Sequence, residues 1–212
     1  MNTSLELWLV RHGATAWALN GRHTGRTDLP LLPEGEEEAR RLAPVLAKQR
    51  FAAVLVSPLQ RAQRTAELAG LGPLAQVCPD LQEWDYGTYE GITTATIRQS
   101  VPDWTIWSHG CPGGETMAAV AERCQRVIDL AQAIANADAN AAGAADQASH
   151  QPTKVALVAH GHILRSLAGT WLGLGVPGGA LLTLATATLS VVGYERQQPA
   201  ILRWNAPIQS SI

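Results

Sequence analysis

Two apolar stretches of this sequence each end in a histidine followed by a glycine. The first stretch covers residues 5–10 and the second covers residues 155–159. The polar residues that follow them are Arg11, His12 and Gly13, and His160 and Gly161. Short runs of large and β-branched apolar residues are typical of buried strands, and the carboxyl ends of parallel strands share the edge at which α/β sheets bind ligands. We therefore expect the two histidines to meet at that edge, where Gly13 lets the backbone turn and approach a ligand closely.

Another arginine follows a third apolar run. Residues 51–58 predict a strand and residues 59–69 predict a helix, with Ser57 as its N-cap and Pro58 at its first position. Arg61 lies in the first turn, where free backbone N–H groups bind anions and a guanidinium adds a forked pair of donors. The cationic and imidazole residues at this edge are then Arg11, His12, Arg61 and His160. Such a cluster suits the charged oxygens of a phosphoryl group.

An acid is expected in residues 82–91, where carboxyl residues are interleaved with aromatic residues and glycines. The candidates are Glu83, Asp85 and Glu90. A carboxyl group packed against aromatic rings loses hydration, which favours its protonated form and suits it to general acid catalysis. Spacing alone does not rank the three candidates.

The same histidines allow a second interpretation, a metal site. His160 and His162, together with Glu83 or Asp85, would supply atoms that bind metals. The arginines at the same edge would repel a divalent cation, so the phosphoryl interpretation is favoured and no metal is expected.

The composition excludes several classes of partner. The 212 residues include 16 Lys and Arg against 18 Asp and Glu, which gives a net charge of −2. Binding the backbone of a nucleic acid needs an excess of clustered cations, so no nucleic-acid partner is expected. No signal segment opens the sequence, no apolar run reaches the length of a membrane span, and the three cysteines form no C-x-x-C pair. We therefore expect a cytoplasmic protein with reduced thiols and no membrane partner.

The remaining pattern predicts one α/β domain across residues 1–212. Further strands are predicted at 77–81, 188–194 and 200–205, the last two as a hairpin at a sheet edge. Further helices are predicted from Pro33 onward, at 93–100, at 117–135 after a Thr116 cap, and at 162–172. The predicted loops are 14–28 and 104–114, and the Ala-rich segment 136–152 is expected to be a frayed helix end followed by a flexible loop. The predicted fold has three layers, with a mostly parallel central sheet flanked by helices.

Four motifs, in this order along the chain, resemble the histidine phosphatase superfamily, which includes the cofactor-dependent phosphoglycerate mutases. They are Arg11-His12-Gly13, Ser57-Pro58 with Arg61, Glu83 ahead of Tyr86-Gly87 and Tyr89-Glu90-Gly91, and His160-Gly161. Residues 23–28, 83–91 and 107–116 resemble a narrower group that holds acid phosphatases of actinobacterial type and the yeast sedoheptulose-bisphosphatase. The resemblance covers nearly the whole chain and implies a phosphoglycerate mutase-like fold.

The resemblance also implies roles for the site residues. His12 would be the nucleophile that becomes phosphohistidine, and Glu83 would be the proton donor. The groups that hold the phosphoryl oxygens would be Arg11, Arg61 and His160. The substrate-binding residues would be Gly13, Thr24, Gly25, Tyr86, Gly161 and His162. No metal or organic cofactor is implied.

Two positions depart from the mutases and favour a phosphatase. Ala18 and His162 stand where mutases carry an asparagine, and the loop 107–114 lacks the arginine pair that mutases use for bisphosphoglycerate. We expect hydrolysis of small phosphorylated metabolites such as sugar phosphates, with a phosphoglycerate mutase as the alternative enzyme. An inactive phospho-ligand binding protein would have lost a catalytic residue, and all five are present. The sequence is compatible with a homodimer.

Overall fold

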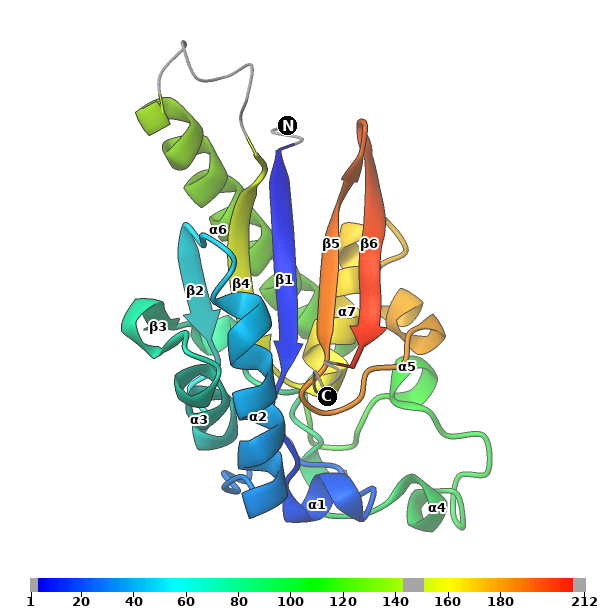
Figure 1. Ribbon diagram of the computed structural model, residues 1–212. Helices are drawn as coiled ribbons and strands as arrows, with labels where there is room; N and C mark the ends of the chain where they lie inside the picture. The colour runs from blue at the N-terminus through cyan, green and yellow to red at the C-terminus, as the bar shows by residue number, and fades with distance from the viewer. Residues whose placement is uncertain (1–3, 143–150, 208–212) are drawn as a thin grey trace.

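The structure is a computed structural model that describes residues 4–142 and 151–207, and its centre is a six-stranded sheet (Figure 1). The strands are β1 (Leu5–Arg11), β2 (Ala53–Val56), β3 (Ala75–Val77), β4 (Thr153–Ala159), β5 (Leu189–Glu195) and β6 (Gln198–Ala206). They lie in the order β3-β2-β4-β1-β5-β6. The pairs among β1 to β4 are parallel, and β1–β5 and β5–β6 are antiparallel. The predicted mostly parallel sheet and its closing hairpin are confirmed.

Helices cover both faces of the sheet, because its central strands are apolar at successive positions. The long helices are α2 (Pro33–Leu46), α3 (Gln60–Leu68), α6 (Met117–Ala142) and α7 (Gly161–Trp171). In β1, Trp8 and Val10 pack in the core with α2 and α3, whereas Leu7 and Leu9 pack with α6 and α7. Alternate side chains of a strand point to opposite faces, so β1 is buried on both. The predicted three-layer α/β fold is confirmed (Figure 1).

Shorter elements connect these layers. They are the helices α1 (Ala16–Leu19), α4 (Thr94–Ile97) and α5 (Ile106–His109), and the 3-10 turns η1 (Gly72–Leu74), η2 (Pro79–Leu81), η3 (Gly87–Tyr89) and η5 (Val176–Leu181). Figure 1 shows α1 and α4 beyond the arrowhead of β1, at the carboxyl edge of the parallel strands. No helix within the described ranges is long and apolar enough to span a membrane.

Several local predictions are wrong. Residues 77–81 do not form a strand, because β3 ends at Val77 and Pro79 opens the 3-10 turn η2. The predicted loops 14–28 and 104–114 contain the helices α1 and α5. Helix α6 continues to Ala142, so the helix end expected after residue 135 is regular helix, and the part of the predicted flexible loop at 143–150 lies outside the described residues.

The predicted start of α3 is also wrong, because tertiary contacts take over its cap. Leu59 is the N-cap and makes no side-chain capping bond. The Ser57 hydroxyl accepts from the N–H of Leu59 at 3.3 Å and lies 2.7 Å from Nε2 of His160, which follows the neighbouring strand β4. The first backbone N–H of the helix, at Gln60, donates to the Asp28 carboxylate at 2.9 Å. The predicted anion site at this helix start is therefore filled by an acid of the chain itself.

Candidate active site

His12 follows β1 and is nearly buried, with 4% of its surface exposed. Its Nδ1 lies 2.7 Å from the carbonyl oxygen of Gly13. A carbonyl oxygen only accepts hydrogen bonds, so the proton sits on Nδ1 and Nε2 keeps its lone pair. Burial, and then the charges of Arg11 and Arg61, lower the pKa of His12 well below its ordinary value of 6.5. The imidazole is therefore neutral at neutral pH and has a nucleophilic nitrogen.

Arg11, the last residue of β1, supplies a cation beside His12. Its Nη1 donates a hydrogen bond to the carbonyl oxygen of Leu184. Its Nε is buried and has no hydrogen-bond partner among the residues that the structure describes. A β-carbon added to Gly161 would lie 3.5 Å from this nitrogen, so the glycine packs directly beside it. A buried donor without a partner costs about 1–3 kcal/mol, which an anionic ligand in the site would offset.

Arg61 and His160 form a buried pair next to His12. The ring centroids of His12 and His160 are 5.1 Å apart. Arg61 donates from Nε to Nδ1 of His160 at 3.0 Å, and the rest of its guanidinium donates to the carbonyl oxygens of residues 24, 25 and 27. Burial and the charge of Arg61 lower the pKa of His160 well below 6.5. The predicted cationic cluster therefore comes together from three strand ends, with Arg61 and His160 packed inside the protein.

Glu83 is buried at the amino end of α7. Its Oε1 accepts from the backbone N–H groups of Trp84, at 3.0 Å, and Ile163, at 2.9 Å. Its Oε2 accepts from the N–H of His162 at 3.0 Å. Unpaired N–H groups at a helix start attract a carboxylate, so the backbone itself fixes this acid. Oε2 makes one such bond against two for Oε1, so Oε2 keeps a lone pair for a further partner.

The other two candidate acids, Asp85 and Glu90, accept hydrogen bonds from backbone N–H groups of loops. Asp85 accepts from a backbone N–H of its own turn, and its Oδ2 lies 3.4 Å from Nε of Arg26. Glu90 accepts from the N–H groups of Gly25, at 2.9 Å, and Thr27, at 3.1 Å. The structure therefore separates three carboxyl groups that spacing could not rank.

Glu90 and Arg61 fix the turn at Thr24 and Gly25 from opposite sides. Glu90 binds its N–H groups, and Arg61 binds its carbonyl oxygens. Gly25 is packed so tightly that a β-carbon there would lie 2.5 Å from the carbonyl oxygen of Trp84. The turn is thus held in place before any ligand binds.

Gly13 was expected to let the backbone approach a ligand closely, but it packs against another element of the protein. A β-carbon there would lie 2.2 Å from the carbonyl oxygen of Gly35 in α2, and its N–H donates to the hydroxyl of Thr65 at 3.1 Å. Gly13 therefore lets α2 approach the end of β1, and its carbonyl orients His12. Its contact with the site runs through that carbonyl.

Tyr86 and His162 form a neutral wall of the site. The Tyr86 hydroxyl lies 2.6 Å from Nδ1 of His162. Burial raises the pKa of Tyr86 well above its ordinary value of 10.0 and lowers the pKa of His162 well below 6.5. The ring of His23, which the sequence analysis did not single out, lies 4.8 Å from the Tyr86 ring and 6.1 Å from that of His162.

Arg165 is a second residue that the sequence analysis missed. Its guanidinium lies 4.8 Å from the ring centre of Trp107, and its Nε donates to the carbonyl oxygen of Gly179 at 3.0 Å. His162 and Arg165 are three residues apart in α7, so they lie on one face of the helix. That spacing is the signal from which the arginine could have been predicted.

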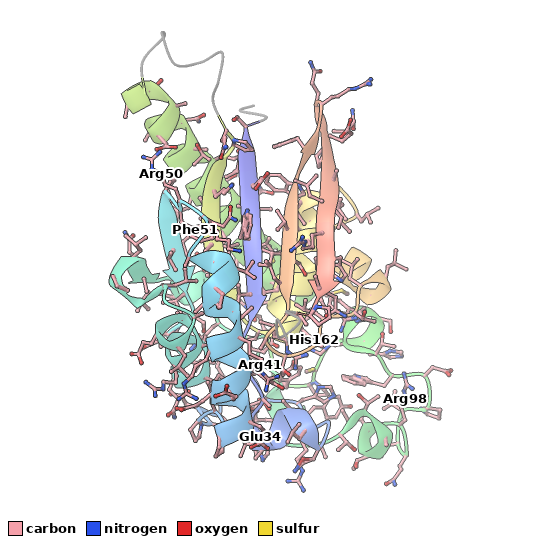
Figure 2. All side chains as sticks on the ribbon, viewed as in Figure 1. Glu34, Arg41, Arg50, Phe51, Arg98 and His162 are labelled. Carbon is pink, nitrogen blue, oxygen red and sulfur yellow. The ribbon has the colours of Figure 1, made fainter. Side chains whose placement is uncertain are left out.

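A cavity of about 190 Å³, the catalytic cavity, lies at the carboxyl edge of the sheet. Its wall consists of Arg11, His12, Ala18, Gly21, Arg22, His23, Thr24, Glu83, Tyr86, Gly161, His162, Arg165 and Leu184. Figure 2 shows His162 at this end of the molecule. Of the predicted site residues, Gly13, Gly25, Arg61 and His160 support the wall from behind and are not part of its described lining.

Two groups of the alternative metal site, His160 and Glu83, are already engaged. Both ring nitrogens of His160 and both carboxylate oxygens of Glu83 form hydrogen bonds within the protein. Within residues 4–142 and 151–207, no group of three His, Cys, Asp or Glu side chains could hold a metal ion. The arrangement suits phosphoryl binding instead, with one neutral nucleophile, fixed cations and a buried acid.

Comparisons with known proteins agree with this geometry. A sequence model of the histidine phosphatase superfamily (branch 1) matches residues 7–207. An acid phosphatase of Mycobacterium tuberculosis is 38% identical over 202 residues, which cover 93% of this chain and 91% of that protein. The sedoheptulose 1,7-bisphosphatase of Saccharomyces cerevisiae is 36% identical over 192 residues, which cover 79% and 68%.

A solved structure shows the same fold. The structure of an open reading frame from Mycobacterium tuberculosis superimposes with a TM-score of 0.82 at 34% identity, covering 96% of this chain and 98% of that one. The family model spans nearly the whole chain. Arg11 and His12 of the motifs line the catalytic cavity, and Arg61 pairs with His160 behind its wall. The chain is therefore a histidine phosphatase and belongs to the first branch of that superfamily.

Proposed function

We propose that this enzyme hydrolyses phosphomonoesters of small metabolites, such as sugar phosphates, through a phosphohistidine at His12. The observation that carries the proposal is the fixed imidazole of His12, whose Nδ1 is bonded to Gly13 and whose Nε2 is left for attack. Beside it, Nε of Arg11 is buried without a partner in the described ranges. A nucleophile next to an unused cationic donor suits a phosphoryl group, whose oxygens need such donors.

In the first step, Nε2 of His12 bonds to phosphorus while the bond to the leaving oxygen breaks. Arg11 and Arg165 line the cavity and offset the charge on the phosphoryl oxygens. Arg61, packed behind the cavity wall, adds its positive charge to the site, and His160, whose ring nitrogens bond to Arg61 and Ser57, orients that guanidinium. Glu83 gives its proton to the leaving oxygen, which departs as an alcohol.

In the second step, water replaces the histidine. The ionised Glu83 takes a proton from the water as its oxygen bonds to phosphorus, and the bond to Nε2 breaks. Inorganic phosphate leaves, His12 is neutral again, and Glu83 is protonated for the next cycle. This sequence of steps uses no metal and no organic cofactor.

Two features support hydrolysis over phosphoryl exchange. Ala18 lines the cavity at a position where the resemblance places an asparagine in mutases. The catalytic cavity, at about 190 Å³, is also smaller than the roughly 300–1,000 Å³ typical of pockets for larger ligands. We infer that it takes the phosphoryl group and the adjoining atoms of a small substrate. A cytoplasmic location and a homodimer stay predictions.

The test is a direct comparison of the two activities. We expect the enzyme to release phosphate from p-nitrophenyl phosphate and from sugar phosphates, with no loss of activity in EDTA. With 3-phosphoglycerate it should release phosphate or do nothing. Rapid formation of 2-phosphoglycerate that depends on 2,3-bisphosphoglycerate would overturn the proposal in favour of a mutase.

A further inference from the structure

A second cavity, the distal cavity, adjoins the catalytic cavity. Its volume is about 300 Å³, and it shares His23 and His162 with the catalytic cavity as common wall. The two shared rings have centroids 6.1 Å apart. Burial lowers the pKa of both imidazoles below 6.5, so this common wall is uncharged at neutral pH. A substrate whose phosphoryl group reaches His12 can therefore extend past two neutral rings into the distal cavity.

The distal cavity is built by α4, α5 and η5, outside the elements that hold His12 and Glu83. The indole rings of Trp104 and Trp107 form part of its wall, and Thr94 and Thr105 bring hydroxyl groups. Aromatic faces beside hydroxyl groups suit a chain that exposes both C–H and O–H groups. These walls are compatible with the hydroxylated carbon chain of a leaving alcohol.

Arg98 gives the distal cavity a positive charge. It lies at the end of α4, is exposed, and lines the cavity. Its Nε donates to the carbonyl oxygen of Trp104 at 3.0 Å, which fixes the plane of the guanidinium. Within the described ranges Arg98 forms no ion pair, whereas Arg40, Arg64 and Arg126 on the helix surfaces all pair with acids. Its Nη1 and Nη2 are therefore available for an anion.

The two cavities together carry more positive charge than one phosphoryl group needs. Arginines line them at four positions, which are 11, 22, 98 and 165, and Glu83 is the one carboxylate in their described lining. Arg11 and Arg165 already lie in the cavity wall that contains His12. Arg98 lines the distal cavity and not the catalytic cavity, and the two cavities share His23 and His162.

Building on the proposed function, we infer that the preferred substrate is a phosphomonoester whose hydroxylated leaving group carries a second anionic group, which binds Arg98. The first phosphoryl group binds at His12, the carbon chain passes the rings of His23 and His162, and the second anion lies in the distal cavity. A guanidinium with two free nitrogens binds a phosphate or a carboxylate through paired donors.

The test uses competitive inhibition of p-nitrophenyl phosphate hydrolysis, which reports binding whether or not the sugar itself is hydrolysed. The probes are fructose 1,6-bisphosphate, fructose 1-phosphate and fructose 6-phosphate. Wild-type enzyme should bind the bisphosphate more tightly than either monophosphate. Arg98→Gln should weaken the bisphosphate about 10-fold, as expected for the loss of a hydrogen-bonded ion pair, and should leave both monophosphates and p-nitrophenyl phosphate unchanged.

Arg50→Gln is the matched control, because Figure 2 shows Arg50 and Arg98 at opposite ends of the molecule. It removes the same charge and should change none of the inhibition constants. Arg98→Lys keeps the charge and should retain part of the preference, and thermal melting checks that each variant is folded. Since Arg98 is exposed, the preference should also shrink between low and high salt.

Three outcomes would overturn the inference: no preference for the bisphosphate in the wild type, no effect of Arg98→Gln, or an equal loss with all three sugars. Each of these leaves the proposed function standing as long as p-nitrophenyl phosphate is hydrolysed. Absence of phosphate release from p-nitrophenyl phosphate by the wild type would instead remove the proposed function itself.

Discussion

His12 and His160 lie with their ring centroids 5.1 Å apart and carry their protons on opposite nitrogens. The carbonyl of Gly13 fixes the proton of His12 on Nδ1, and the guanidinium of Arg61 fixes the proton of His160 on Nε2. Two neighbouring neutral imidazoles thus have different abilities: His12 can attack phosphorus, and His160 can donate a hydrogen bond. Arg61 sets this difference although its side chain is fully buried.

Arg61→Lys should therefore lower activity by about 10²-fold. A lysine keeps the charge but cannot reach His160 and the carbonyl oxygens of residues 24, 25 and 27 at the same time. The measurement is kcat with p-nitrophenyl phosphate, together with the melting temperature, which should also fall because buried acceptors lose their partners. Arg64→Lys, at an exposed position of the same helix, is the control and should change little. Activity of Arg61→Lys within about twofold of wild type would show that the several N–H donors of the guanidinium are dispensable.

Glu83→Gln should slow the transfer of phosphate from sugar phosphates far more than from p-nitrophenyl phosphate. An alkoxide leaves poorly without a proton, whereas a nitrophenolate needs little help, and general acid assistance is worth about 10²–10⁴-fold. Single-turnover rates of histidine phosphorylation are the measurement, since the same carboxylate also acts on water in the second step. Asp85→Asn, on a loop beside Arg26, is the control. Equal losses on both substrates would contradict an acid role for Glu83.

Glu90→Gln should raise KM more than it lowers kcat. The carboxylate binds the N–H groups of Gly25 and Thr27, and an amide can replace only part of this acceptor capacity. The turn at Thr24 would then be less well fixed, which weakens substrate binding by an expected ~3–10-fold for the loss of one or two charge-assisted bonds. Steady-state kinetics with a sugar phosphate give the two constants. A fall in kcat alone, with KM unchanged, would speak against a positioning role.

The rate of histidine phosphorylation should stay constant as the pH falls from 8 to about 6.5. The pKa of His12 is lowered below 6.5 by burial and by the charges of Arg11 and Arg61, so its neutral and reactive form persists to a lower pH than that of an ordinary histidine. Any loss caused by protonation of His12 should begin below pH 6.5. Burst kinetics with p-nitrophenyl phosphate between pH 5 and 8 measure how this rate depends on pH. A fall in the phosphorylation rate that is centred above pH 6.5 would contradict the lowered pKa of His12.

The parts of this site that the sequence predicted rest on local patterns. Apolar runs that end in His12 and in His160 identify buried strands and place both imidazoles at one sheet edge, because parallel strands share their carboxyl ends. A local pattern also predicted the antiparallel hairpin of β5 and β6, whose strands are close in sequence.

The parts that spacing alone could not decide depend on contacts between distant segments. Glu83 is distinguished from Asp85 by N–H groups of α7, which lie 79 and 80 residues further along the chain. Ser57 is not the helix cap because α3 begins after Leu59, and its hydroxyl also pairs with His160, 103 residues away. Gly13 packs against Gly35 rather than a ligand. No local propensity contains such information, so spacing alone could name these residues but not assign their roles.

The position of the phosphoryl group on the histidine tests the central claim most directly. Enzyme quenched with alkali during turnover of phosphorus-labelled p-nitrophenyl phosphate should carry an acid-labile phosphate on Nε2 of His12, because Nδ1 is bonded to Gly13. The label should be absent from His12→Ala and unchanged in His109→Ala, which alters an exposed histidine of α5. Chromatography of the two phosphohistidine isomers and peptide mapping give the position. Phosphate on Nδ1, on another residue, or retained in His12→Ala would contradict the account.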